Sequence, residues 1–461
     1  MTVEQVDAPA PERVPAGPPV RRRVRGNVAM AVEELAGQPV VVARSTSIER
    51  RGALSIDDGA TLATAAELAM ELRIPLVLVL ASSGADVSGG IESLHGWGRA
   101  ARAFAAASGS VPILAAVTGP AISGPALMLG IADVVLMTPD AFAFVSGPRM
   151  VEDFTGITLG IHQLGGTAVH ARSSGLCALE VADEADALAH IAYLLSFLPA
   201  NSDEEPPLVA CGEPLDEPVP SLRTAIPDRA TSSYDVRTVA AAVCDDRELL
   251  ELAPRWSSQL VTALGRVGGR PVGFLANQPQ TLAGTLDIAA SQKGARFVRF
   301  CDAFNLPLVT LVDTPGFLPG KDLEWRGMIR HGAELAFAYA EATVPRVCVI
   351  LRKAFGGAYI VMDSKGLGND LCYAWPSAEI AVMGAQGAVQ ILYRKASPGE
   401  RQGLQDDYTN RFLTPWQAAE RGFVDAVIDP ADTRSALAAA LGALCTEREH
   451  LPGRKHALGP L

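Results

Sequence analysis

The fold is decided by VPRVCVILRKAFGGAY at 344–359, an apolar run that begins at a proline and ends in small residues. A similar run, LPLVTLVDTPGF at 306–317, precedes it, with the two prolines 38 positions apart (307 and 345). The first half of the chain carries the same pair, IPLVLVLASSGA at 74–85 and VPILAAVTGPAISGPA at 111–126, with prolines 37 positions apart (75 and 112). Each second run reaches its small-residue step 11 positions after its proline (112 to 123, 345 to 356).

The repeat, displaced by about 233 positions (111 to 344), indicates a duplicated domain, because the units of solenoid proteins are far shorter. A length of 461 residues is enough for two domains with full cores. The 43 glycines and an aromatic content of only 6% suit tightly packed α/β layers. We therefore predict an α/β fold in two tandem copies.

The bulk properties also exclude several classes of protein. A net charge of −12 argues against general nucleic-acid binding, and we interpret the basic run at 21–25 as a solvated tail or a partner contact. The seven cysteines are scattered without a Cys-x-x-Cys pair, so we predict a reducing, cytoplasmic location and no metal site. The sequence shows no signal-peptide pattern and no run of 18 apolar residues, so we expect no membrane association.

Strands and helices alternate in both halves, and a proline-rich acidic stretch at 199–227 separates them. We predict a disordered tail at 1–25, an N-terminal domain at 26–222 and a C-terminal domain at 223–461. The predicted helices include 58–72, capped by Asp57 or Asp58, and 96–108 in the first half, and 287–304 and 329–341 in the second. We expect Arg102 and Lys293 to lie on solvated helix faces rather than at phosphate groups of a ligand.

The chemistry is expected at the two strand ends of the second half. Gly356 and Gly357 follow a buried strand, where the backbone can approach a ligand closely with free N–H groups. The loop at 315–317 could supply a second donor. Two backbone N–H groups that converge on one oxygen stabilise an oxyanion by about 3–4 kcal/mol per donor. The alternative is that the two glycines only permit close packing of helix on strand.

The second half resembles the carboxyltransferase (β) subunit of biotin-dependent acyl-CoA carboxylases of the propionyl-CoA and acetyl-CoA carboxylase type. The matching segments cover nearly all of 265–430 and are GRPVG (269–273), ANQP (276–279), LDIAAS (286–291), ARFVR (295–299), CDAFN (301–305), TPGFLPG (314–320), FAYAEATVP (337–345), RKAFGGAY (352–359), AWP (374–376), AVMGAQGA (381–388) and AERGFVD (419–425). The resemblance implies two crotonase-like (ββα-superhelix) domains and a homohexamer built from face-to-face dimers. It places the active site between one subunit's N-terminal domain, which holds acyl-CoA, and its partner's C-terminal domain, which holds carboxybiotin.

The resemblance also implies roles for individual residues. Gly357 and Ala358 would donate backbone N–H groups to the ureido oxygen of biotin, and the biotin anion could then accept the α-proton of the acyl group. Ser123 and Gly124 would be the catalytic pair on the acyl-CoA side. The residues expected to contact substrate are Gly84, Ala85, Gly316, Phe317, Gly356, Tyr359 and Ile360.

The first half departs from the family at these very places. The family's Ser-Gly-Gly-Ala-Arg loop is Ser-Ser-Gly-Ala-Asp at 82–86, which replaces a positive charge with a negative one. The family's Ala-Gly-Gly-Ala step is Ile-Ser-Gly-Pro at 122–125, and a proline has no N–H to donate. These departures call the acyl-CoA half of the site into question.

The leading hypothesis is a carboxyltransferase that moves a carboxyl group from carboxybiotin to the α-carbon of a short acyl thioester, as in the formation of malonyl-CoA. The chain shows no Met-Lys-Met biotin attachment site and no ATP-grasp glycine loop, so the biotin is expected on a separate carrier protein charged by a separate biotin carboxylase. The acyl group could be carried by CoA or by an acyl-carrier protein. The alternatives are a biotin-dependent decarboxylase of malonyl or methylmalonyl thioesters and a catalytically degenerate scaffold subunit.

Overall fold

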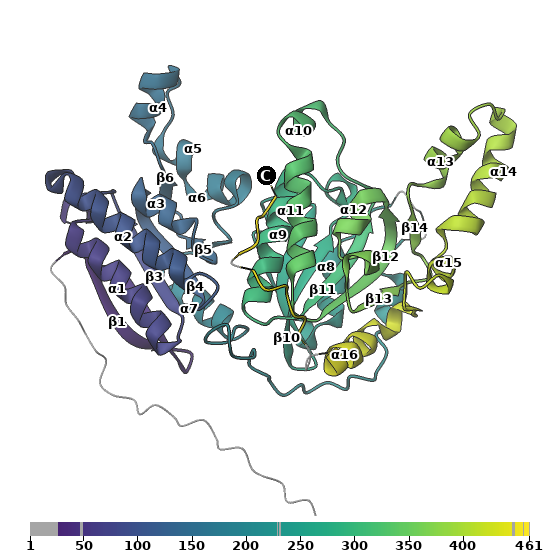
Figure 1. The fold of residues 1–461 in the computed structure, drawn as a ribbon, viewed down its shortest axis with the longest axis horizontal. Coiled ribbons are helices and arrows are strands. Elements are labelled where there is room, and N and C mark those ends of the chain that lie inside the picture. The colour runs from purple at the N-terminus through teal and green to yellow at the C-terminus, as the bar shows by residue number, and fades with distance from the viewer. Residues whose placement is uncertain are drawn as a thin grey trace, which may run out of the picture.

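The computed structural model describes residues 26–46, 49–227, 229, 232–444, 448–454 and 456–460. The predicted tail at 1–25, with its basic run, lies outside the described residues. Two α/β halves lie side by side, and two helical arms project from them, α4 with α5 from the first half and α13 with α14 from the second (Figure 1). Within the described ranges, no helix is long and apolar enough to cross a membrane.

The first half is built on a seven-stranded sheet with the order β1-β2-β3-β4-β5-β7. The remaining strand, β6, pairs with the last residues of β4, at 120–122. Apart from β1, which is antiparallel to β2, all of its strands pair in parallel. Its elements are β1 (Val28–Leu35), β2 (Gln38–Ser45), α1 (Ile56–Leu72), β3 (Leu76–Ser82), α2 (Ile91–Ala107), β4 (Ile113–Ile122), α3 (Gly124–Leu129), β5 (Val134–Met137), β6 (Phe142–Phe144), α4 (Pro148–Thr155), α5 (Ile161–Gly165), α6 (Thr167–Val169), β7 (Leu179–Glu180) and α7 (Glu184–Leu195).

The second half is built on an eight-stranded sheet with the order β15-β13-β12-β11-β10-β9-β8, and β14 pairs with β12. Its elements are α8 (Val236–Val243), β8 (Leu249–Leu252), β9 (Leu260–Val267), β10 (Arg270–Asn277), α9 (Ile288–Ala303), β11 (Leu308–Thr314), α10 (Lys321–Trp325), α11 (Met328–Glu341), β12 (Arg346–Phe355), α12 (Gly356–Val361), β13 (Leu371–Ala374), β14 (Glu379–Ala381), α13 (Ala385–Leu392), α14 (Pro398–Tyr408), α15 (Pro415–Glu420), β15 (Ala426–Val427) and α16 (Thr433–Leu444).

The two sheets share one topology, which confirms the predicted duplication and the α/β class. Strands β9 to β15 of the second sheet follow the order of β1 to β7 in the first, and only β8 is added at an edge. Even the irregularities repeat. The pairing of β3 with β4 shifts between Leu80 and Ser82, and that of β11 with β12 shifts between Val312 and Thr314. These shifts fall where the strands approach the predicted site loops.

Alternate side chains of the strands enter different cores, as the two-residue period of a strand requires. In the first sheet Val41 and Leu78 pack with α1 and α2, whereas Val40 and Val79 face the second half. There they join a buried cluster that includes Leu264 and residues of α9. One continuous core therefore runs through both halves, while α8 and α16 cover the far face of the second sheet.

Two helix starts differ from the predictions. Helix α1 is capped by Ser55 rather than by Asp57 or Asp58, because the Asp58 carboxylate accepts the N–H of Ser55 in a capping box. Helix α2 begins at Ile91, five residues before the predicted start at 96. Gly96 lies inside the helix, where α2 crosses α1: a Cβ on Gly59 would come within 2.1 Å of the carbonyl carbon of Gly96. The glycine permits this crossing and marks no boundary.

The expectation for Lys293 is wrong, whereas Arg102 is exposed as predicted. Lys293 on α9 is 4% exposed, and its ammonium donates to the carbonyl oxygens of Ala253 (2.9 Å), Trp256 (3.0 Å) and Leu260 (2.7 Å). Burial lowers the pKa of Lys293 to about 7, while three carbonyl acceptors favour the charged form, since only an ammonium has three N–H donors. Lys293 thus fixes the loop between β8 and β9.

That loop docks on the first half. The N–H of Ala253 donates to the carbonyl of Ala178 (2.9 Å), and the ring of Trp256 covers Gly175, where a Cβ would lie 2.3 Å from the indole. Earlier in the chain, the predicted linker at 199–227 is tied to the second half through the Val209 N–H, which donates to the carbonyl of Gly269 (3.0 Å). The boundary between 222 and 223 stays a prediction.

Candidate functional site

The first-half residues of the predicted site lie together at the end of β3 and β4. Gly84 has φ +107, and a Cβ placed on it would lie 3.2 Å from the carbonyl oxygen of Ile122. Ser123 follows with φ 59 and ψ −115, a conformation that is strained for any residue with a Cβ. Its N–H donates to the carbonyl of Phe144 (2.9 Å), which fixes the step from β4 into α3. Ala85 pairs with Leu54 in an isolated parallel bridge.

The second-half residues repeat this geometry at the end of β11 and β12. Gly356 has φ +61, close to the value at Ser123, and Gly316 has φ +144. Phe317 pairs with Leu286 in the same kind of isolated parallel bridge that joins Ala85 to Leu54. The ring of Phe317 lies 3.6 Å from the Cβ position of Gly357. By this correspondence Gly124 matches Gly357, and Pro125 matches Ala358.

The two small-residue steps, at 123–125 at the start of α3 (the α3 step) and at 356–358 at the start of α12 (the α12 step), differ in the backbone N–H donors that they offer. The first N–H groups of a helix have no acceptor within the helix, and neither α3 nor α12 has a side-chain cap. In α12 the N–H groups of Gly357, which is exposed, and of Ala358, which is buried, therefore both lack an acceptor within the helix. In α3 only Gly124 can donate from the matching pair, because Pro125 has no N–H.

A cavity of about 480 Å³ lies beside the second-half step. It brings together four residues that were predicted to contact the ligand, Gly356, Gly357, Tyr359 and Ile360, and its other walls are mainly apolar side chains of β14, α14, α15 and the segments that follow α14 and α15. Ile360 is 46% exposed toward it, whereas Tyr359 is buried. Burial raises the pKa of Tyr359, so its hydroxyl stays protonated and uncharged at neutral pH.

One chain does not bring the two steps together. Figure 1 shows α3 in the first half and α12 in the second, with α9 and α11 between them. Each set of predicted residues is thus assembled within its own half, and a site that uses both steps requires a second copy of the chain. Among the described residues, no group of three or more His, Cys, Asp or Glu side chains is placed to hold a metal ion.

Sequence reasoning gave no role to two side chains at the first-half step. Arg50 pairs with Asp86, the acidic residue that replaces the family's arginine, and hydrogen bonds from Ser88 lower the pKa of that carboxylate. Trp97 of α2 lies over Gly124, where a Cβ would be only 2.9 Å from the indole ring. The motif HGWG at 95–98, an aromatic residue between two glycines in a helix, was the signal that could have pointed to Trp97.

Comparison with known proteins assigns the chain to a family. The carboxyl transferase domain matches residues 19–458. The chain is 44% identical over 403 residues to a propionyl-CoA carboxylase carboxyltransferase subunit of Haloferax mediterranei, covering 85% of this chain and 78% of the relative. It is 42% identical to the methylmalonyl-CoA carboxyltransferase 12S subunit of Propionibacterium freudenreichii, covering 92% and 82%. It is 41% identical to the methylmalonyl-CoA decarboxylase subunit alpha of Veillonella parvula, covering 89% and 80%.

A solved structure of transcarboxylase 12S, described as a hexamer with methylmalonyl-CoA bound, superposes with a TM-score of 0.92 at 41% identity. The match covers 94% of this chain and 85% of that one, and it confirms the predicted pair of crotonase-like domains. The chain therefore belongs to the carboxyl transferase family, as a carboxyltransferase (β) subunit of the type found in biotin-dependent acyl-CoA carboxylases.

Proposed function

We propose that the α12 step and its cavity bind the biotin of a separate carrier protein, while the α3 step of a second copy binds a short acyl-CoA. The observation that carries this proposal is the uncapped start of α12, where Gly356 and Gly357 line a largely apolar cavity of about 480 Å³. A ureido oxygen needs two convergent donors, and an apolar ring system needs such walls. Carboxybiotin, when bound, supplies the activated carboxyl group.

The chain's own groups would then act by position and charge stabilisation. The N–H groups of Gly357 and Ala358 hold negative charge on the ureido oxygen, and the N–H of Gly124 faces the thioester oxygen of the acyl group. Apolar walls such as Ile360 and Val382 keep water from the reacting carboxyl group. The exposed Ile360 also bounds the space for the acyl chain, which favours acetyl-CoA and propionyl-CoA as acceptors.

The two projecting arms support a homo-oligomer, the hexamer implied by the family. Helix α4 exposes Met150 (65%) and Phe154 (92%) beside the acidic Glu152 and Asp153. An exposed apolar area of this kind on a charged arm is typical of an interface. Among the described residues, nothing within this chain covers Phe154 to any extent, so we expect a second copy to do so.

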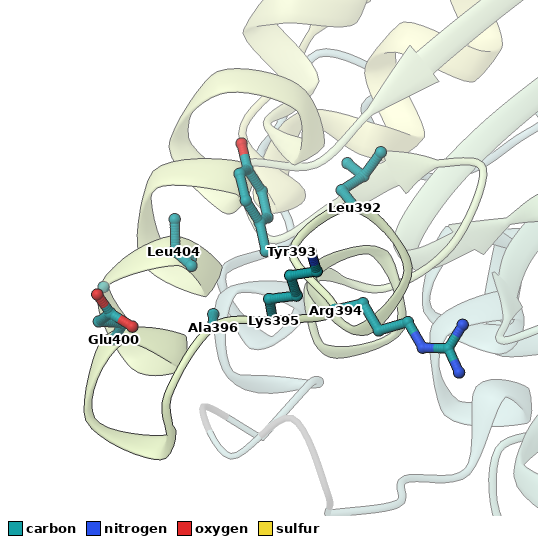
Figure 2. Close-up of a pocket in the computed structure, with 8 residues that line it drawn as sticks. Leu392, Tyr393, Arg394, Lys395, Ala396, Glu400 and Leu404 are labelled. Carbon is teal, nitrogen blue, oxygen red and sulfur yellow. The ribbon is translucent and has the colours of Figure 1, made fainter.

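The elbow between α13 and α14 also exposes apolar side chains beside charged ones. A shallow, open hollow of about 840 Å³ lies there, with Arg394 and Lys395 next to the exposed Leu392 and Tyr393. Figure 2 shows Arg394 and Glu400 pointing to opposite sides of this elbow. Exposed apolar side chains on both arms support pairing of the first half of one copy with the second half of another. A biotin carboxylase, a biotinylated carrier and a cytoplasmic location complete the proposal.

The test uses the purified full-length chain with free biotin and either malonyl-CoA or methylmalonyl-CoA, and it follows loss of the carboxyl group by mass spectrometry. This partial reaction needs both steps but no partner subunit. We expect turnover that depends on biotin. Biotin-dependent turnover that is absent for both thioesters, in an assembly shown by light scattering to be oligomeric, would contradict the proposal.

A further inference from the structure

The first-half step has one backbone donor where the second-half step has two. Gly124 and Pro125 occupy the positions of Gly357 and Ala358, and Pro125 has no N–H. Removal of one donor from an oxyanion site lowers the rate constant by about 10²–10³-fold. A first half that binds an acyl thioester productively therefore needs a donor from elsewhere.

Trp97 is the side chain nearest to the Cβ position of Gly124, and its indole carries such a donor. The atoms nearest to the Cβ position of Gly124 are Cδ2 and Cγ (both 2.9 Å) and Cδ1 (3.1 Å) of Trp97. These three atoms belong to the five-membered ring of the indole, and Nε1 is bonded to Cδ1. The ring that carries the N–H thus covers the glycine whose own N–H remains at the step.

The indole N–H is free to bind a ligand. Trp97 is half-buried, and among the described residues its Nε1–H has no hydrogen-bond partner. The position of the ring is fixed from behind, because α2 crosses α1 in close contact at the neighbouring Gly96. A donor held on a rigid helix is preorganised and costs little to reorganise during reaction.

The second half provides the contrast. The aromatic ring that contacts its step is Phe317, 3.6 Å from the Cβ position of Gly357, and a phenyl ring has no N–H. The step with two backbone donors is thus lined by an aromatic ring without a donor. The step that lacks one backbone donor is lined by an aromatic ring that has one.

We propose that the Nε1–H of Trp97 and the N–H of Gly124 together form the oxyanion site for the thioester oxygen of the acyl group. The inference rests on the proposed function. When the α C–H bond breaks, its electron pair moves through the α-carbon toward the thioester oxygen, and the two donors stabilise the enolate. The electron pair then forms the C–C bond between the α-carbon and the carboxyl carbon. The α-proton is accepted by the biotin nitrogen that released the carboxyl group.

The experiment compares three variants with the wild type in the biotin-dependent partial reaction. Trp97→Phe keeps an aromatic ring but removes the N–H, and we expect kcat to fall at least tenfold with little change in KM. Pro125→Ala restores the backbone N–H that Ala358 has in the second half, and alone it should raise kcat a few-fold. The double variant W97F/P125A should recover most of the activity that W97F loses.

A binding measurement separates this inference from the proposed function. A CoA thioether that carries a nitronate mimics the enolate charge, and its Kd requires no turnover. Trp97→Phe should weaken nitronate binding at least tenfold while binding of CoA itself changes less than twofold. If the wild type bound the nitronate in this Trp97-dependent way but turned over neither thioester, the proposed function would fail and the inference would stand.

Two results would overturn the inference. One is a Trp97→Phe variant with wild-type kcat and nitronate affinity, in which case the ring is only a wall of the acyl site. The other is a W97F/P125A variant that stays as slow as W97F although its thermal unfolding matches that of the wild type. In that case the loss in W97F comes from the shape of the ring and not from its N–H.

Discussion

The two halves keep the same backbone and differ in the groups that the backbone presents. Both place a positive-φ residue after the central strand, Ser123 in the first half and Gly356 in the second. Both close the neighbouring loop with an isolated parallel bridge. The donors nevertheless differ at Pro125 and Ala358. The comparison teaches that the sheet sets where a step lies, whereas the few residues of the step set what it binds.

The strongest way to break the comparison is to give the second half the proline of the first. In Ala358→Pro the Gly-Pro pair found at 124–125 is reproduced, so the backbone should accommodate it. Loss of one donor should lower biotin-dependent turnover by about 10²–10³-fold. Ala358→Gly keeps the N–H and should lose far less. Equal losses in the two variants would mean that the N–H of Ala358 does not act on the ligand.

A second difference lies six residues after the helix cap of each half. Lys293 donates to three buried carbonyls, whereas Thr61 at the matching position donates only to Asp57 of its own helix (2.9 Å). Lys293→Met removes three buried hydrogen bonds and should lower the free energy of unfolding by about 3 kcal/mol. Thr61→Val should lower it by less than about 1 kcal/mol. Urea unfolding of both variants checks this contrast.

The same variant gives a pH test. The pKa of Lys293 is about 7 in the folded chain and about 10.5 in an unfolded one, so the unfolded state binds more protons between these values. The contribution of Lys293 to stability should therefore rise as the pH increases from 7 to 10. The difference between wild type and Lys293→Met should show this slope. A flat difference would mean that the three carbonyls hold the amine charged throughout.

The third test concerns space at the two glycines. A methyl group on Gly124 would lie 2.9 Å from the Trp97 ring, whereas one on Gly357 would lie 3.6 Å from Phe317, an ordinary contact. Gly124→Ala should therefore destabilise the protein by about 1–2 kcal/mol through displacement of Trp97, and Gly357→Ala by clearly less. Thermal unfolding would show which variant loses more stability, and a larger loss in Gly357→Ala would contradict the steric argument.

The smallest effect is expected from strain. Ser123 adopts φ 59 and ψ −115, and glycine stands at the matching position of the second half. Ser123→Gly should raise the free energy of unfolding by about 1 kcal/mol, because the relief of strain exceeds the added backbone entropy of a glycine. Gly356→Ser should lower it. Changes of opposite sign in the free energies of unfolding of the two variants would support strain at Ser123.

Periodicity and turn residues predicted the central strands of both halves, because buried parallel strands are continuous apolar runs. The same reasoning missed the strands β1, β8 and β9, and it misread Gly96 and Lys293. Gly96 looks like a helix boundary, and only the crossing of α2 over α1 explains it. Lys293 looks like a surface residue, because the carbonyls that bind it come from a loop more than 30 positions away in sequence.

The candidate site was predictable where the backbone acts and not where side chains act at a distance. The positions of Gly124 and Gly357 follow from spacing alone. The contact between Trp97 and Gly124 depends on how α2 packs against α3, which no local pattern encodes. The exposed arms also escaped prediction, since in our proposal their partner is a second copy rather than the chain itself.

The core that runs through both halves, including Val79 and Leu264, has a consequence for how the protein unfolds. A cluster shared in this way makes the two copies a single cooperative unit, so calorimetry should record one transition and not two. A substitution that destabilises the chain near one step then also lowers the fraction of molecules in which the other step is folded. Although the two halves arose as separate copies of one pattern, selection on either step acts through the same equilibrium between folded and unfolded chain.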